Sequence, residues 1–201
     1  MKETVRFTGL LLLLVLTMVA SGCAGTVKNM REVPPAEAVY APDAGKAMVV
    51  FMRPSGLGFA VQSSVFEIKE ELPSLVGIVA AKKKVTYQAQ PGERLFMVVG
   101  EAADFMSANL QAGRTYYVLV TPRPGAWKAR FSLRPAEASE LDSSRLDDWL
   151  TSCEWVEKTA GSDAWANNNM SSIRDKQVKY YQKWLSKDPA ERPRLMPEDG
   201  R

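Results

Sequence analysis

"TYYVLV", residues 115–120, is the strongest β segment of the sequence. It consists almost entirely of aromatic and β-branched residues, which are enriched in strands. Ala112-Gly113 before it and the segment from Pro122 to Gly125 after it carry the residues that form turns. The stretch therefore predicts one strand of a β-rich domain, bounded by a turn on each side.

Short apolar or alternating runs recur on both sides of this strand. They predict further strands at 47–53, 61–68, 75–80, 85–89, 94–99, 105–110 and 127–133. Strands this short, with frequent turn signals, are typical of a β-sandwich or a partly open barrel. We place an antiparallel β-sandwich-like domain at residues 46–135. Its core candidates are Phe51, Phe96, Val98, Tyr117 and Leu119.

The hydrophobic period changes after Pro135, so residues 136–201 are predicted to be a helical region with a non-helical tail from Pro189. Two helices are expected, and the fold class is therefore α+β. The first has an apolar stripe of Leu146, Trp149, Leu150, Cys153 and Val156, and it ends before Gly161. The second begins at Ser162 or Asp163. Because tryptophan side chains are costly to leave in water, we expect both helices to pack on the sandwich or on each other, with Trp155 as the most exposed of these rings.

The N-terminal segment carries the sharpest functional signal. Lys2 and Arg6 precede the apolar run "LLLLLVLTMVASGC", residues 10–23, which ends in small residues. A positive start, a short apolar run and a small-residue cleavage site predict a secretory signal peptide, here residues 1–22. The run is too short for a comfortable membrane-spanning helix, which needs about 20 apolar residues.

Ala20-Ser21-Gly22-Cys23 resembles the lipobox of bacterial lipoproteins, although Leu is commoner at the position of Ala20. The resemblance implies cleavage between Gly22 and Cys23, acylation of Cys23 with chains such as palmitate, and the lipid bilayer as a partner. Ala24 is not the Asp of an inner-membrane retention signal, so the resemblance implies the bacterial outer membrane, with the protein facing the periplasm. Residues 23–45 would be the lipidated Cys and a flexible tether. The alternative is an ordinary signal peptide with an accidental Cys.

Three segments of the β region carry a second resemblance. They are Val50-Phe51-Met52-Arg53-Pro54, the Pro91-Gly92 turn, and the run from Leu110 to Val118. Together they resemble the bacterial family named domain of unknown function 2846, whose members are often lipoproteins with a small β-sandwich. That family implies no activity and no catalytic residue. The sequence departs from it at Lys69 to Pro73, where the family tends to have a glycine-containing hairpin.

Composition argues against several classes of function. The chain has no His, which removes the commonest general base and the commonest metal ligand. It carries 26 Lys and Arg against 23 Asp and Glu, too even a balance for a dedicated nucleic-acid binder. We therefore predict no catalytic residue, no metal, no cofactor and no nucleic-acid partner. If Cys23 is lipidated, Cys153 has no partner for a disulfide within the chain.

Two further groups of residues are candidate sites. Lys82, Lys83 and Lys84 form a candidate contact for lipid phosphate or another anionic envelope polymer, with a solvated strand end as the alternative. Cys153 lies on the predicted apolar face of a helix, which favours a buried structural thiol over a reactive one.

These observations leave three hypotheses for function. The first is a non-catalytic envelope lipoprotein that binds or supports another envelope component. The second is an accessory or assembly lipoprotein of an envelope or secretion machine, with the helical region as the element that contacts a protein partner. The third is an enzyme acting on cell-envelope material, which the absence of any nucleophile motif disfavours.

Overall fold

The structure is a computed structural model that describes residues 27–125 and 129–201. Within those residues, eleven strands form two sheets. The six-stranded sheet has the order β1 (Met30–Glu32), β10 (Glu154–Lys158), β5 (Lys83–Ala89), β2 (Ala47–Arg53), β8 (Thr115–Arg123) and β9 (Arg130–Pro135). The five-stranded sheet has the order β11 (Arg194–Leu195), β7 (Ala103–Leu110), β6 (Gly92–Val99), β3 (Ser63–Lys69) and β4 (Leu72–Val79). The predicted signal peptide, Gly22 and Cys23 lie outside the described residues.

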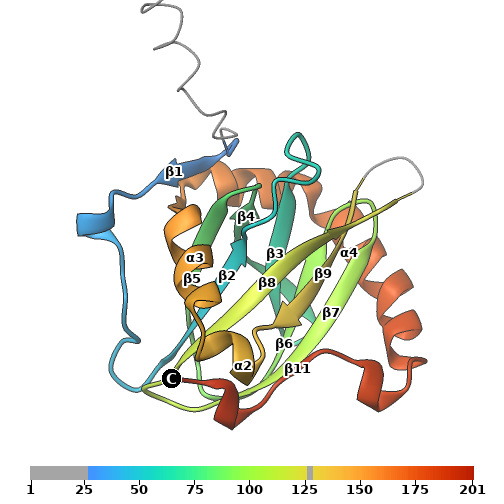
Figure 1. Cartoon of the computed structure of the whole chain (residues 1–201). Coiled ribbons are helices and arrows are strands. Elements are labelled where there is room, and N and C mark those ends of the chain that lie inside the picture. Colours follow the sequence, from blue (N-terminus) through green and yellow to red (C-terminus); the bar gives the residue numbers. More distant parts are fainter. Residues whose placement is uncertain (1–26, 126–128) are drawn as a thin grey trace, which may run out of the picture.

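The two sheets pack face to face, with helices on both outer sides (Figure 1). The α+β class is thus confirmed, and the predicted antiparallel arrangement holds for most strand pairs but not for all of them. β2 runs parallel to β8, β10 parallel to β5, and β11 parallel to β7. Parallel neighbours need a long crossover connection, and here the intervening chain builds the other sheet or a helix before it returns.

The core between the sheets is made by side chains that face inward, at alternate positions along the strands. Phe51, Phe96 and Val98 have no exposed surface, as predicted. The rings of Phe51 and Phe96 meet edge to face with centroids 5.2 Å apart. Leu119 and the half-buried Tyr117 differ from the prediction, because they pack on the outer face of the six-stranded sheet.

That outer face is apolar because β2 is buried along its whole length and on both sides. Val49 and Phe51 face the other sheet, while Met48, Val50 and Met52 face outward. Helices α2 (Ala138–Leu141) and α3 (Ser144–Ser152) cover part of the outward-facing residues.

The long helix α4 (Ala160–Leu185) covers the outer face of the five-stranded sheet (Figure 1). Ile173 and Trp184 are buried there, and the ring of Tyr181 meets that of Phe105 with centroids 5.1 Å apart. The side chain of Thr159 accepts a hydrogen bond at the helix N-terminus. Gly161 therefore lies in the first turn of α4, and its predicted role as the end of the preceding helix is wrong.

The apolar stripe that predicts one helix from Leu146 to Val156 is split between two elements. α3 ends at Ser152, and Cys153 is already extended with φ −110° and ψ 130°. Glu154 to Lys158 form β10, which joins β5 on one side and β1 on the other. Trp155 becomes buried as a result, with 9% of its surface exposed, so its predicted exposure is wrong.

Both ends of the described chain add to the sheets, which the sequence does not predict. β1 lies in the predicted tether, where Val27 is also buried, followed by the short 3-10 helix η1 (Pro35–Glu37). In the predicted tail, β11 buries Leu195 completely between two short helices, η2 (Pro189–Glu191) and η3 (Pro197–Asp199). The prediction of a flexible tether over residues 23–45 therefore does not hold for the two segments that form β1 and η1.

The hairpin between β3 and β4 forms without glycine. Glu70 and Glu71 both have positive φ, 49° and 67°, as the two central residues of a type I′ turn require. A charged dipeptide without glycine thus makes this turn.

Candidate binding pocket on the six-stranded sheet

A pocket of about 620 Å³ opens on the outer face of the six-stranded sheet. Its floor comes from β2 and β8, one wall from residues 32–40, and the opposite wall from β5, the end of α3 and β10. The lining residues are Glu32, Val33, Pro34, Pro35, Tyr40, Met48, Val50, Lys84, Tyr117, Leu150, Thr151, Cys153, Glu154 and Trp155. Most of these are apolar or aromatic, as is usual for small-molecule sites.

The strand pleat places the floor of the pocket. Met48 and Val50 alternate with Val49 and Phe51, which belong to the core between the sheets. Tyr117 stands next to Val50 because β2 and β8 pair in that register. Burial raises the pKa of the Tyr117 hydroxyl, so this group stays neutral and can donate or accept a hydrogen bond.

The wall formed by residues 32–40 is held by an aromatic contact and by backbone bonds. The ring of Tyr40 meets that of Trp155 edge to face, with centroids 5.6 Å apart. The Val33 N–H donates to the Trp155 carbonyl at 2.9 Å, and the Tyr40 hydroxyl donates to the Pro35 carbonyl at 2.8 Å. Tyr40 is still 60% exposed, so its ring covers the pocket from the solvent side.

Lys84 is the buried cation of the pocket, with 4% of its surface exposed. Its ammonium group donates to the carbonyls of Leu150 and Cys153 and lies 4.3 Å from the centroid of the Trp155 ring. Burial lowers its pKa, and within the described residues it has no carboxylate partner. An anionic or strongly accepting group in the pocket would therefore find a cation that the protein leaves without a counter-charge.

Cys153 contributes a buried thiol, as predicted. Its burial raises the pKa of the thiol, which keeps it protonated. A thiol of this kind is a poor nucleophile, and no His of the chain could activate it.

The structure does not bring Lys82, Lys83 and Lys84 onto one surface. Lys82 is exposed in a turn with φ 60°, whereas Lys83 is fully buried and pairs with Glu32 at 2.6 Å and with Glu154. Lys84 faces the pocket. Of the three predicted anion contacts, only Lys82 is exposed to a large polymer or a membrane.

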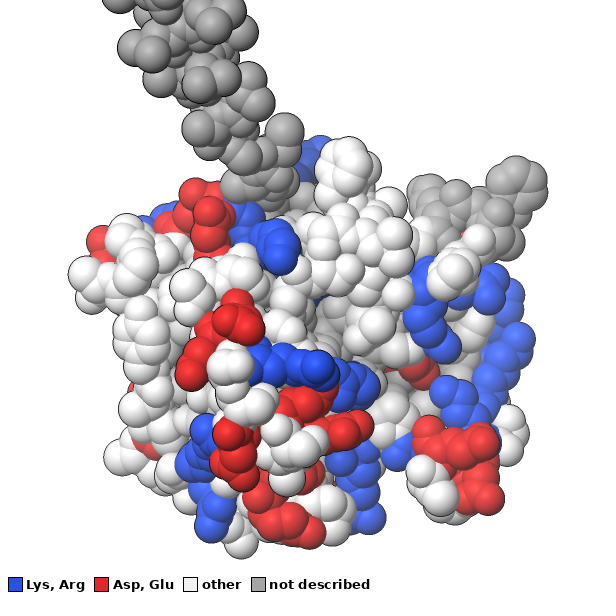
Figure 2. Space-filling view, in the orientation of Figure 1, with Lys and Arg blue, Asp and Glu red and all other residues white. Residues whose placement is uncertain are grey.

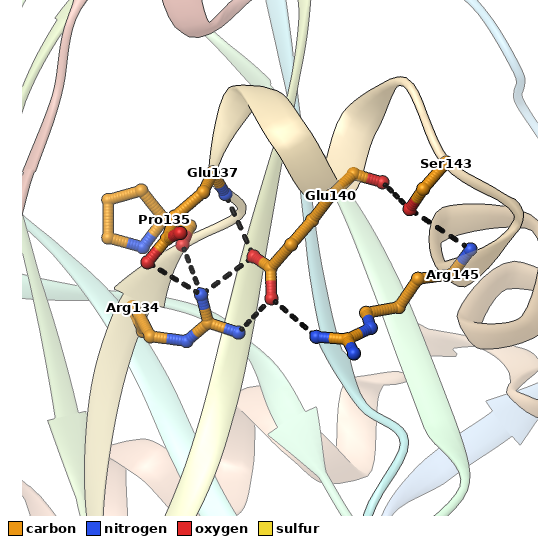
Figure 3. Close-up of polar contacts among 6 residues, drawn as sticks. All are labelled: Arg134, Pro135, Glu137, Glu140, Ser143 and Arg145. Carbon is orange, nitrogen blue, oxygen red and sulfur yellow. Dashed lines mark hydrogen bonds and ion pairs between the residues drawn. The ribbon is translucent and has the colours of Figure 1, made fainter.

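A second cavity, of about 520 Å³, lies beside α2 and α3. Figure 3 shows why its polar groups are already engaged: both oxygens of Glu140 accept from Arg134, at 2.7 and 3.0 Å. Arg145 is 3.5 Å from the same carboxylate, and the Glu137 N–H donates to it at 2.9 Å. The hydrogen bonds from Arg134 lower the pKa of Glu140. This network joins β9 to the two helices.

Most of the pocket is not predictable from the sequence, because the segments that form its walls are far apart in the chain. One signal was available: the unbroken apolar run "AMVVFM", residues 47–52, indicates a strand covered on both faces. Asp147 and Asp148, which precede the pocket residues of α3, are exposed.

No group of metal-ligating side chains is found among the described residues. In the same part of the chain, no helix has the length and hydropathy needed to span a membrane. A scan against protein-family models finds no match, and no curated protein matches the sequence.

Proposed function

We propose that this chain is a non-catalytic, lipid-anchored binding protein of the bacterial outer membrane, facing the periplasm. The anchor is the acylated Cys23, and the binding site is the pocket on the six-stranded sheet. The lipobox-like end of the signal segment supports the anchor, because two or more acyl chains hold a protein stably on a bilayer. The resemblance to a family of lipoproteins with a small β-sandwich agrees with it.

One observation carries the binding function: the pocket combines apolar walls with a single buried ammonium group, that of Lys84, which has no ion pair in the described chain. We infer that the ligand is an amphiphile with a linear apolar body and one carboxylate-like head. Met48, Val50 and the Trp155 ring would contact the body. Lys84 would donate its remaining N–H to the head.

Binding can be tested on the full chain by titration with a medium-chain fatty acid while the tryptophan emission is followed. We expect a saturable change that Tyr40→Ala weakens, because this variant removes the ring that covers the pocket from the solvent side. Tyr180→Ala on α4 is the matched control and should bind like the parent protein. A titration that is linear and identical in all three proteins would exclude this ligand class.

The anchor is tested separately by intact-mass measurement of protein from the membrane fraction. We expect acyl chains on Cys23 and cleavage after Gly22. Cys23→Ser should remain unprocessed or leave the membrane. A mature N-terminus at another residue, without acyl mass, would contradict the lipoprotein assignment.

A further inference from the structure

Two large apolar side chains are exposed in the loop that joins β2 to β3. Leu57 and Phe59 have 66% and 67% of their surface exposed, among the highest values for large apolar residues of the described chain. Single exposed apolar residues are common, but two on one loop tip form a contact surface when the loop is held in place.

This loop is held from below by a buried arginine. The guanidinium group of Arg53 donates to the carbonyls of Leu57, Gly58 and Val61 at 2.6, 2.7 and 2.6 Å. It also lies 4.9 Å from the centroid of the Phe131 ring, and Arg53 itself has no exposed surface. These hydrogen bonds hold the backbone of the loop that carries the exposed Leu57 and Phe59 side chains.

The described chain begins at the same end of the sandwich. The Ile78 N–H contacts the sulfur of Met30 in β1 at 3.4 Å, and Ile78 pairs with Ser64, the second residue of β3 after the loop. Figure 1 shows β1 at the top of the view, the end toward which β2 points. In Figure 2 the upper part of the molecule is mostly uncharged (white), with Lys and Arg (blue) and Asp and Glu (red) side chains together at its left.

The fold leaves little chain between this end and the proposed anchor. Val27 is already buried, with 8% of its surface exposed, and β1 is fixed by its pairing with β10. Only residues 24–26 separate Val27 from Cys23, so the two Cα atoms can be at most about 14 Å apart. If Cys23 is acylated, as proposed above, this end of the sandwich must lie next to the bilayer.

We propose that the β2–β3 loop contacts the membrane, with Leu57 and Phe59 in the interfacial region of the lipid. The exposed Lys28 and Lys82 lie at the same end and would face lipid phosphates. Each of three acidic groups there has a basic partner: Glu32 and Glu154 share Lys83, and Glu101 pairs with Arg130. The protein would thus lie on the membrane in a fixed orientation, and the pocket would be held close to the lipid surface.

The orientation can be measured on the full lipidated chain in vesicles of phosphatidylethanolamine and phosphatidylglycerol. Phe59→Cys is labelled with an environment-sensitive fluorophore, and Ala112→Cys, at the opposite end of the sandwich, is the matched control. The buried Cys153 is protected from labelling in the folded protein. We expect lipids with a quencher in the acyl chain to quench the label at 59 and to leave the label at 112 unchanged.

A spacer variant provides the second measurement. About 20 Gly and Ser residues inserted between Gly25 and Thr26 would let the domain move away from the bilayer. We expect quenching at 59 to fall while the protein stays in the vesicle fraction. Equal quenching at 59 and 112, or none at either with the protein still vesicle-bound, would overturn the membrane-facing loop and leave the anchor intact. Loss of the parent protein from the vesicles, without acyl mass on Cys23, would overturn both proposals.

Discussion

The ammonium group of Lys84 lies 4.3 Å from the centroid of the Trp155 ring. Neither residue is where the sequence predicts it, because the sequence predicts Lys84 in a basic run that contacts anions or solvent and Trp155 as the most exposed ring of the helical region. Their contact holds β5 and β10 side by side, in the register Trp155↔Lys84. The same ammonium group binds the Leu150 carbonyl in the last turn of α3, where a cation is favourable. Lys84 therefore links the sheet, the helix end and the pocket.

Lys84→Met tests this linkage. Methionine keeps the bulk of the side chain but leaves the carbonyls of Leu150 and Cys153 without their donor, so we expect a loss of about 1–3 kcal/mol in the free energy of unfolding. Lys82→Met, at the exposed neighbour, is the control and should stay within about 0.5 kcal/mol of the parent. Urea denaturation followed by circular dichroism measures both. A more stable Lys84→Met protein would mean that the burial of the charge outweighs its hydrogen bonds.

The central strands can be predicted from the sequence, whereas the surroundings of Lys84 cannot. β2, β6 and β8 are recognisable because their own residues carry the signal: apolar or β-branched runs bounded by turns. β1 carries no such signal. Its three residues become a strand only by pairing with β10, more than a hundred residues later in the chain.

The error at Cys153 has a related cause. Three- and four-residue spacing of apolar side chains fits a helix through Val156, and the local sequence offers no break. The backbone groups of Glu154 and Trp155 find partners in Lys82 and Val33 instead, and those bonds come from distant segments. The pocket cannot be predicted from the sequence for the same reason, since its walls come from segments that are brought together only by the fold.

Phe96→Ala tests the core between the sheets. The Phe96 ring is fully buried between those of Phe51 and Tyr87, at centroid distances of 5.2 and 6.2 Å. Its removal should cost about 3–5 kcal/mol in the free energy of unfolding, because a large cavity remains. Phe59→Ala makes the same chemical change at an exposed site and should be nearly neutral. Similar denaturation midpoints for the two variants would contradict the assigned core.

Leu195→Ala asks whether the C-terminal segment belongs to the fold. Leu195 is fully buried in β11, so its truncation should cost about 2–5 kcal/mol. Leu72→Ala, at a leucine that is 52% exposed at the start of β4, is the control for the same change on the surface. Thermal denaturation should show a clearly lower midpoint for Leu195→Ala alone. Equal midpoints would mean that the tail does not pack on β7.

Glu140→Gln tests the network of Figure 3 through its pH dependence. The hydrogen bonds from Arg134 lower the pKa of Glu140 in the folded state, below the value of about 4.3 for an unfolded chain. A lowered carboxyl pKa contributes stability that is present above the unfolded value and is lost as the pH falls through the folded one. Near pH 7 the variant should therefore be less stable than the parent by about 1.5–3 kcal/mol, the range for a hydrogen bond to a charged group.

As the pH falls below the unfolded value and through the lowered folded one, the parent carboxylate takes up a proton, and the difference between parent and variant should shrink. Glu137→Gln, whose side chain is 71% exposed at 3.8 Å from Arg134, is the matched control and should change stability little at any pH. Urea denaturation at a series of pH values between 3 and 7 gives the comparison. A difference between parent and Glu140→Gln that stays constant over this range would show that the carboxylate charge does not hold β9 to the helices, and that the side-chain shape alone does.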